Sequence, residues 1–278
     1  MTAPEGDCPG LLIAGAQRCG TSYLHEFLAH HPSLLAPRFV KELHFFDRRF
    51  SRGWDWYRRQ WPDRADGRLR FETSPEYMFD PLARLRIIRH LPETKILLCL
   101  RCPVARLESA YRRYIRNTGK RISGEEFLER DPTAVSRGLY SVQVEPLLNA
   151  FGGNLRVLIY ERDLEEASLK HHLSRFLGVD EEGFSSAVIG HRNVGTQRRF
   201  PAVYGFLVGV RKRLLRSDAD RVVSALDHLR PGRLFPPQSG EGPALGTELK
   251  RELTEVYAPD RERLESLLGQ FLKDLWHV

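Results

Sequence analysis

The sequence predicts an α/β fold of the P-loop-like, three-layer kind, with a central, mostly parallel sheet flanked by helices. Short β-like runs alternate with amphipathic, helix-like runs, as in chains whose parallel strands are joined by crossover helices. The run Ile96–Leu100 is continuously apolar, which is typical of a strand covered on both faces. Leu11–Leu28 reads as an apolar strand, a short loop bounded by two glycines, and an amphipathic helix.

The expected strands are short apolar runs at Leu11–Ala14, Leu69–Glu72, Lys95–Leu100 and Arg156–Tyr160. Helix start signals lie between them. Asp80-Pro81 sets a capping carboxylate and a first-turn proline ahead of a helix over Leu82–Leu91. Pro103 starts the next helix, and Ser123-x-x-Glu126 is a capping box for a third.

The C-terminal third is expected to be partly irregular. Glu166–Leu177 is amphipathic and stops at Gly178, whereas Pro146 lies in an earlier helical run, so that helix is kinked or starts later. Arg230–Gly246 is rich in proline and glycine and is expected to form an exposed loop. The tail over 248–276 returns to helical periodicity, and we expect it to pack on the same domain. A single domain over 1–278 is therefore predicted.

The composition limits the class of protein. The net charge of +7 suits an anionic ligand, and charge alone would also suit nucleic acid or a membrane surface. No apolar run approaches the roughly 20 residues needed to span a bilayer. The first ten residues, MTAPEGDCPG, lack the basic flank and apolar core of a secretory signal, and the four cysteines show no disulfide or zinc pattern. We therefore expect a cytoplasmic protein.

The glycine-bounded loop is the most informative segment. A strand, a tight loop and a helix form a nest of backbone N–H groups at a helix N-terminus, which is an anion site. Gly15 and Gly20 have the spacing of a nucleotide P-loop, but Thr21 stands where that loop has its lysine. Arg18 is the cation within the loop, and Ser22 adds a second hydroxyl at its exit.

Two further segments indicate which anion is bound. Arg101 follows the buried strand Lys95–Leu100, at the edge of the sheet where ligands bind in such folds, and a cation there favours a second anion over a metal. Ser109 lies two helical turns further on. Glu42 and His44 stand two residues apart among aromatic side chains.

These three segments resemble the sulfotransferases that use 3′-phosphoadenosine-5′-phosphosulfate (PAPS). The first is similar to the family's 5′-phosphosulfate loop, G-x-x-[KR]-x-G-T-x-x-L, and ends here at Leu24. The third, which contains Glu42 and His44, is similar to the K-E-x-H-F-F-D stretch of the branch that includes the heparan sulfate sulfotransferases. The second is similar to the 3′-phosphate segment, R-x-P-x-x-R-x-x-S-x-Y, and is matched by Arg101, Pro103, Arg106, Ser109 and Tyr111. The matches run in family order over nearly the whole chain.

The resemblance implies roles for named residues. Those that would cradle the 5′-phosphosulfate are Arg18, Cys19, Gly20, Thr21 and Ser22. Arg101 and Ser109 would bind the 3′-phosphate, which distinguishes PAPS from ATP. Tyr160 would lie against the adenine, although a tyrosine at a strand end is also common in a core. The nearest candidates for the family's basic loop at the adenine end are Arg198 and Arg199.

The chain also departs from the family pattern. Arg18 replaces a lysine that many members have, and the tyrosylprotein sulfotransferases share this arginine. Thr73 stands where the heparan sulfate 3-O enzymes place a lysine, which argues against assigning their polysaccharide substrate. The cysteine pair near the C-terminus of the Golgi enzymes is missing, which agrees with a reducing compartment.

The chemistry explains these residue types. Sulfuryl transfer is an in-line displacement, and a fixed cation such as Arg18 stabilises the charge that develops on the bridging oxygen without a metal. Glu42 is the candidate general base, a role that typically contributes roughly 10²–10⁴-fold, although it could simply pair with Lys41. Phe45 and Phe46 are expected to raise the pKa of Glu42 by desolvation. His44 either acts directly or orients a partner.

We therefore predict a PAPS-dependent sulfotransferase that acts on a hydroxyl of a carbohydrate or small secondary metabolite and releases 3′-phosphoadenosine-5′-phosphate (PAP). No nucleic-acid partner, metal or membrane span is expected. The alternatives are a kinase with a divergent loop and a non-catalytic polyanion-binding protein. The loops over 47–62 and 116–138 carry no acceptor signature, and the cluster of Trp54, Trp56, Tyr57 and Trp61 suits an acceptor cleft or a core equally well. The sequence carries no signal for the oligomeric state.

Overall fold

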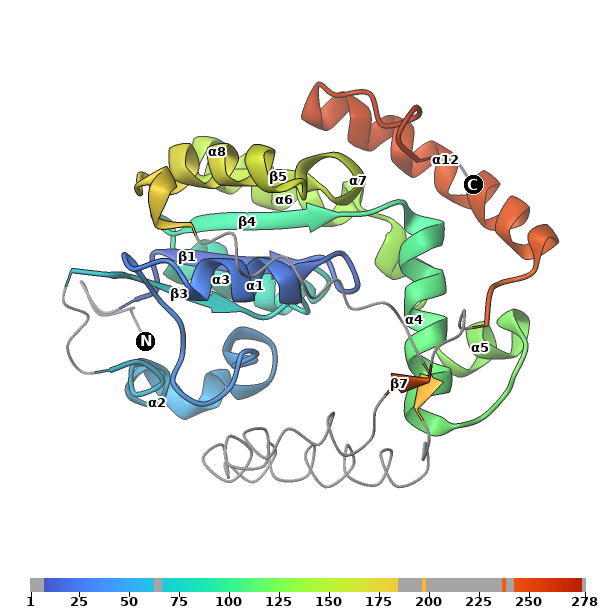
Figure 1. The fold of residues 1–278 in the computed structure, drawn as a ribbon, viewed down its shortest axis with the longest axis horizontal. Helices are drawn as coiled ribbons and strands as arrows, with labels where there is room; N and C mark the ends of the chain where they lie inside the picture. Colours follow the sequence, from blue (N-terminus) through green and yellow to red (C-terminus); the bar gives the residue numbers. More distant parts are fainter. Residues whose placement is uncertain (1–7, 63–66, 185–196, 199–236, 239–242, 277–278) are drawn as a thin grey trace. The chain divides into compact units, whose positions relative to one another are not determined.

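The computed structural model describes residues 8–62, 67–184, 197–198, 237–238 and 243–276. Its centre is a five-stranded sheet with the order β2-β3-β1-β4-β5, in which every pairing is parallel (Figure 1). The strands are β1 (Leu11–Gly15), β2 (Leu34–Leu35), β3 (Leu69–Thr73), β4 (Lys95–Leu100) and β5 (Leu155–Ile159). The predicted α/β class is confirmed, and β2 is the strand of this sheet that sequence periodicity missed, because it has only two residues.

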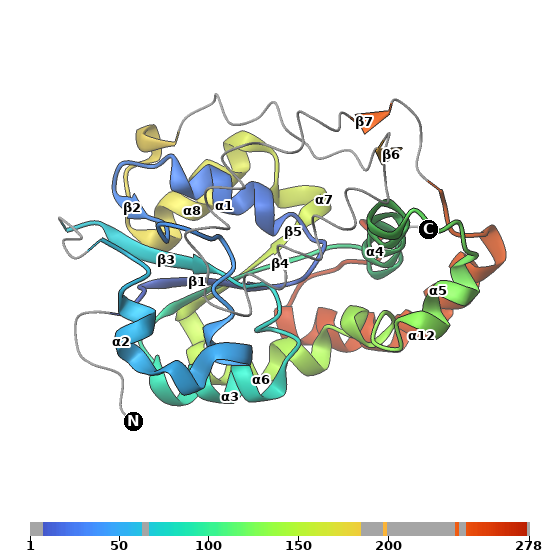
Figure 2. The ribbon, with the colours of Figure 1, turned by 90° about the horizontal axis from the view of Figure 1, so that it is seen from below.

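Helices cover both faces of this sheet. Figure 2 shows α1 and α8 on one face and α3 and α6 on the other. The α-helices are α1 (Thr21–Ala29), α2 (Gly53–Arg58), α3 (Pro81–His90), α4 (Pro103–Thr118), α5 (Gly124–Arg130), α6 (Ser141–Phe151), α7 (Tyr160–Asp163), α8 (Glu166–Leu177) and α12 (Thr247–Leu268). Because β1 and β4 lie between these layers, all five residues of β1 and five of the six in β4 are buried.

The local start and stop signals form as predicted. The Asp80 carboxylate accepts a hydrogen bond from the Ala83 amide at 2.8 Å, and Ser123 Oγ accepts one from the Glu126 amide at 3.1 Å. α8 ends at Gly178, whose φ of 74° lies in the left-handed region that favours glycine. Pro146 lies inside α6, which begins five residues earlier.

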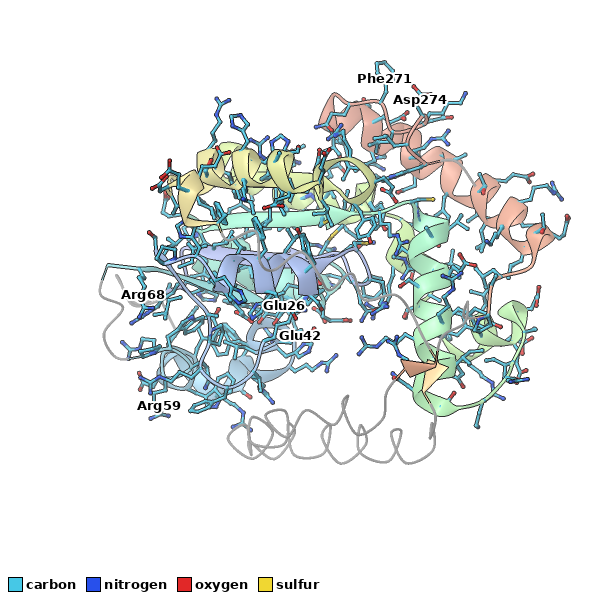
Figure 3. All side chains as sticks on the ribbon, in the orientation of Figure 1. Glu26, Glu42, Arg59, Arg68, Phe271 and Asp274 are labelled. Carbon is cyan, nitrogen blue, oxygen red and sulfur yellow. The ribbon has the colours of Figure 1, made fainter. Side chains whose placement is uncertain are left out.

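Other expectations fail where burial does not follow periodicity. The apolar periodicity of the tail includes Val256 and Phe271, but 52% and 86% of their surfaces are exposed, and Phe271 points into solvent (Figure 3). Tyr257 is buried in place of its neighbour. Tyr160 is the first residue of α7 rather than the last of a strand.

The aromatic residues after Glu42 form a core cluster. Phe45, Phe46, Tyr57 and Trp61 are fully buried, and Trp54 is nearly so. The ring of Phe45 stacks on that of Tyr57 with centroids 4.2 Å apart. The core alternative is therefore correct for these residues, whereas Trp56 is half-buried.

The chain divides into two compact units. The first holds the described residues of Met1–Pro103, Leu139–Arg192 and Tyr257–His277, and therefore the whole parallel sheet. The second holds those of Val104–Gly138 and Asn193–Val256, including β6 (Gln197–Arg198) paired antiparallel with β7 (Pro237–Gln238). A single domain over 1–278 stays a prediction. Within the described ranges, no helix has both the length and the apolar character to cross a bilayer.

Candidate active site

The loop between β1 and α1 has the geometry of an anion site. Gly20 adopts a φ of 88°, and a Cβ atom there would lie 2.7 Å from Leu164 Cδ1 and 3.1 Å from the Tyr160 ring. No described side chain caps α1 at Gly20, and the first turn carries no acidic residue. The first amides of a helix lack intrahelical acceptors and lie at the positive end of its dipole, so this N-terminus favours a bound anion.

Contacts with the neighbouring strand hold this loop. The Ala16 amide donates to the Cys99 carbonyl on β4 at 2.8 Å. Cys19 is fully buried, and its sulfur lies 3.5 Å from the hydroxyl of Tyr140. That hydroxyl also donates to the Arg101 carbonyl at 2.9 Å, so one side chain connects the loop to the end of β4.

Two candidate catalytic residues have unusual backbone conformations. Among the residues that the structure describes, Arg18 (φ 71°) and His44 (φ 53°) are the non-glycine residues with positive φ. Such a conformation costs roughly 1–2 kcal/mol for an L-residue. Backbone outliers of this kind cluster at functional sites, so the geometry independently marks both positions.

Arg101 lies at the carboxyl end of β4. Its guanidinium carbon is 4.6 Å from the centroid of the half-buried Tyr160 ring, which makes a cation–π contact. Its Nε is buried and has no hydrogen-bond partner within the described ranges. A buried donor without an acceptor is costly, so this position suits a further anionic acceptor. Since Tyr160 also lies beside Gly20, the loop and Arg101 border the same aromatic ring.

Sequence reasoning missed the group that holds this turn. The Glu161 carboxylate accepts hydrogen bonds from the Cys102 amide at 2.9 Å and from Trp276 Nε1 at 3.1 Å. The amide lies next to Arg101, at the start of α4, so Glu161 and the C-terminal tryptophan fix the turn that presents the arginine. This glutamate directly follows Tyr160 in the sequence. The sequence alone does not show whether a glutamate there holds a turn or lies on the surface.

The sequence predicts three further cofactor-binding residues. Ser109 is a half-buried residue of α4 and belongs to the second unit, whereas Arg101 belongs to the first. Arg198 is part of β6, and Arg199 lies outside the described residues. Their roles toward the 3′-phosphate and the adenine stay predictions.

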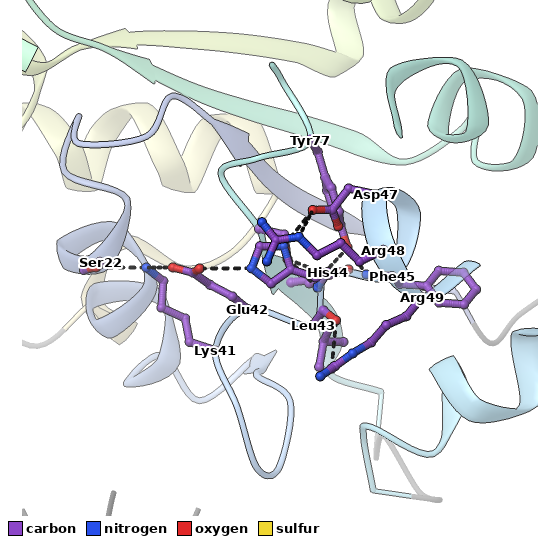
Figure 4. Close-up of polar contacts among 12 residues, drawn as sticks. Ser22, Lys41, Glu42, Leu43, His44, Phe45, Asp47, Arg48, Arg49 and Tyr77 are labelled. Atoms are coloured by element: carbon purple, nitrogen blue, oxygen red, sulfur yellow. Dashed lines mark hydrogen bonds and ion pairs between the residues drawn. The ribbon is translucent and has the colours of Figure 1, made fainter. Parts of the chain in front are cut away.

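A continuous series of polar contacts joins the anion loop to the candidate base (Figure 4). Lys41 Nζ donates to Ser22 Oγ at 2.9 Å and lies 3.4 Å from Glu42 Oε1. The other carboxylate oxygen, Oε2, lies 3.4 Å from His44 Nε2, and His44 Nδ1 lies 2.8 Å from Asp47 Oδ2. The candidate base is therefore held beside the first turn of α1.

The charges in this series are ordered. Burial lowers the pKa of His44, but hydrogen bonds to Asp47 and Glu42 outweigh it and raise the pKa to about 9. His44 is therefore an imidazolium at neutral pH and donates to both carboxylates. The Glu42 side chain is 44% exposed, whereas Phe45 and Phe46 are buried in the aromatic cluster, so these rings do not desolvate it as expected.

His25 is a further residue that sequence reasoning missed. Burial and the Lys41 ammonium lower its pKa to about 3, against the opposing effect of Glu42. Its Nδ1 lies 2.9 Å from Thr73 Oγ1. A neutral histidine therefore lies next to Thr73. The available signal was its position on α1, one helical turn after Thr21.

Comparison with known proteins defines the class. The sulfotransferase domain family matches residues 9–194. Human heparan sulfate glucosamine 3-O-sulfotransferase 6 is 30% identical over 94% of this chain and 72% of the human protein. The mouse protein of the same name is 39% identical over 40% of this chain and 32% of its own length. The crystal structure of a sulfotransferase from Alicyclobacillus acidocaldarius has a TM-score of 0.68 and 25% identity, and the match covers 97% of this chain and 98% of that one.

The chain belongs to the sulfotransferase domain family. It is an enzyme, and PAPS is its sulfate donor. The kinase and polyanion-binding alternatives are therefore wrong. The described residues fit this donor, because the uncapped start of α1 suits one anionic group and the unpartnered Arg101 Nε suits another.

Proposed function

We propose that this chain transfers the sulfuryl group of PAPS to a hydroxyl of a carbohydrate or small-molecule acceptor, with Glu42 as the general base. The observation that carries the proposal is the series of contacts from Ser22 through Lys41 and Glu42 to His44. It joins the anion loop to a carboxylate that is 44% exposed and thus open to an incoming hydroxyl.

Each neighbour of Glu42 has a distinct task in this proposal. Lys41 and His44 lie on different carboxylate oxygens, both at 3.4 Å, and so restrict the rotation of the carboxylate. Since His44 is protonated at neutral pH, it orients Glu42 and does not accept the acceptor's proton. Asp47 fixes the imidazolium from the other side, at 2.8 Å. The proton of the attacking hydroxyl then moves to Glu42.

The donor would be held by residues of several elements. PAPS, when bound, supplies an electrophilic sulfur and an anionic leaving group. Arg18 and the first amides of α1 would bind the 5′ end and stabilise charge there. Arg101, supported by Glu161 and Tyr140, would bind the 3′-phosphate.

The surroundings of the Glu42 carboxylate support a hydroxyl acceptor. A hydroxyl acceptor needs a base, and Glu42 supplies it. The human and mouse relatives are named for heparan sulfate glucosamine, which favours a sugar hydroxyl. The resemblance implies a lysine at position 73 in the heparan sulfate 3-O enzymes, whereas this chain has the neutral His25–Thr73 pair there, which favours an acceptor less anionic than heparan sulfate.

Calorimetry and labelled transfer test the proposal. PAP should bind the wild-type chain much more tightly than ADP, and radiolabelled sulfate should pass from PAPS to at least one of heparan sulfate, octyl glucoside or p-nitrophenol. Glu42→Gln should keep PAP affinity and lose transfer. Full transfer by Glu42→Gln would contradict the assignment of the base.

A further inference from the structure

A buried carboxylate lies behind the candidate base. Glu72, on β3, has no exposed surface. Its Oε1 accepts hydrogen bonds from Ser74 Oγ at 2.7 Å and from the Tyr77 hydroxyl at 2.5 Å, and its Oε2 accepts one from the Tyr57 hydroxyl. Burial raises the pKa of Glu72 above its usual value, while these hydroxyl groups oppose the rise. Neither Glu72 nor these three hydroxyl groups take part in the proposed proton transfer to Glu42.

Two of these hydroxyl groups also hold the segment that carries Glu42. Ser74 Oγ accepts a hydrogen bond from the His44 amide at 3.1 Å, and the Tyr77 hydroxyl accepts one from the Phe45 amide at 2.7 Å. A hydroxyl has one proton to donate. Because both protons are directed to Glu72, both oxygens present lone pairs to the two amides. The carboxylate thus keeps both hydroxyl protons turned away from the amides that hold the segment.

The held segment needs such support. His44 has a φ of 53°, a conformation that is costly for an L-residue and persists only where the surroundings impose it. The two bonded amides stand on either side of the His44 α-carbon and carbonyl. The two hydrogen bonds therefore fix the turn at His44. Glu42 precedes this turn, and Asp47, which contacts the His44 ring, follows it (Figure 4).

We propose that Glu72 is a positioning residue for sulfuryl transfer, which acts through Ser74 and Tyr77 to hold the His44 turn and thereby the direction of the Glu42 carboxylate. This inference rests on the proposed function, because it takes Glu42 as the base. The residues proposed to bind PAPS lie on other elements, in the β1–α1 loop, at the start of α1 and at the end of β4. Positioning by Glu72 should therefore affect turnover and leave donor affinity unchanged.

The third tyrosine provides a matched control. Tyr57 donates to Glu72 Oε2, and its ring stacks on Phe45 at 4.2 Å. Tyr57→Phe keeps the ring and removes a buried hydrogen bond to the same carboxylate. Tyr77→Phe does the same, but it also removes the acceptor of the Phe45 amide. The two variants should thus differ in turnover more than in stability.

The test combines kinetics with amide hydrogen exchange. Tyr77→Phe and Ser74→Ala should lower kcat about 10- to 100-fold, as expected of a base displaced by a fraction of an ångström to an ångström. Their PAP affinity and KM for PAPS should stay within about twofold of wild type. Tyr57→Phe should keep kcat within about threefold. Exchange of the amides over 43–46, measured with PAP bound and no acceptor, should be faster in the first two variants and unchanged in Tyr57→Phe.

The conservative variant separates hydrogen bonding from charge. In Glu72→Gln the amide oxygen can accept from Ser74 and Tyr77 while the amide nitrogen donates to the Tyr57 oxygen, so we expect kcat within about tenfold of wild type. Equal losses of kcat in Tyr57→Phe and Tyr77→Phe would overturn the inference, since both would then report general destabilisation. Unchanged amide exchange in Tyr77→Phe and Ser74→Ala would also overturn it. Full turnover in Glu42→Gln would instead overturn the proposed base, whatever the exchange rates show.

Discussion

The hydroxyl of Tyr140 donates to the backbone carbonyl of Arg101 at 2.9 Å, and the same oxygen lies 3.5 Å from the sulfur of Cys19. One buried side chain therefore contacts both segments that the sequence analysis assigned to the two ends of PAPS. Its own amide is fixed by the Asp260 carboxylate of α12 at 2.7 Å, which ties the arrangement to the C-terminal helix.

Tyr140→Phe should weaken PAP binding, because the end of β4 and the phosphate loop lose their common hydrogen-bonding group. A neutral hydrogen bond contributes about 0.5–1.5 kcal/mol. If the lost bond holds the arrangement that binds PAP, this free energy corresponds to about a 2- to 10-fold weaker affinity. Calorimetry with PAP measures this. Thr94→Val is a matched control, since it removes a buried hydroxyl that donates to the Pro9 carbonyl at 2.9 Å, away from the site. Equal affinities in all three proteins would show that Tyr140 serves the fold alone.

Arg101→Ala should discriminate between nucleotides. A charged hydrogen bond contributes about 1.5–3 kcal/mol, so PAP should bind roughly 10- to 100-fold more weakly, whereas ADP, which lacks the 3′-phosphate, should change little. The exposed Arg89 on α3 supplies a control, because Arg89→Ala removes the same charge away from the site. If PAP and ADP weaken equally in Arg101→Ala, the arginine does not bind the 3′-phosphate.

Glu42→Gln should lower turnover by about 10²–10⁴-fold, the usual contribution of a positioned base. The amide keeps the size of the side chain and its contact with Lys41, so PAP affinity should stay within about twofold. Single-turnover transfer of labelled sulfate measures the first quantity and calorimetry the second. A loss of PAP affinity as large as the loss of turnover would mean that the residue binds the donor.

The raised pKa of His44 predicts a pH dependence of stability. A histidine that gains partners on folding adds stability that is fully present below its unfolded pKa of about 6.5 and is lost as the pH rises through about 9. The free energy of unfolding of wild type should thus fall more between pH 7 and 10 than that of His44→Gln. Urea titrations at both pH values measure the difference. Parallel curves would show that the folded pKa of His44 is not raised.

Local signals explain which parts of this fold the sequence could predict. Asp80 and Ser123 bond to amides three residues away, so their helix starts can be read from neighbouring letters. The apolar run of β4 and the glycines at the end of β1 and in the loop after it are equally local signals. Arg101 was found for the same reason, because a parallel sheet places the residue after each strand at one edge.

Long-range contacts explain what the sequence could not predict. Tyr57 and Glu72 are 15 residues apart, His25 and Thr73 48 apart, and Tyr140 and Cys19 121 apart. No periodicity encodes such pairs. The expectation for Glu42 failed for a related reason, since being next to Phe45 and Phe46 in sequence does not determine which way their rings point.

The left-handed backbone of Arg18 has a consequence for how this enzyme can change. Glycine suits a φ of 71° without the steric cost, so Arg18→Gly should raise the free energy of unfolding by about 0.5–1 kcal/mol while sulfuryl transfer is lost. Selection for stability and selection for activity therefore favour different residues at position 18. Variants chosen only for heat resistance should accumulate glycine or asparagine there.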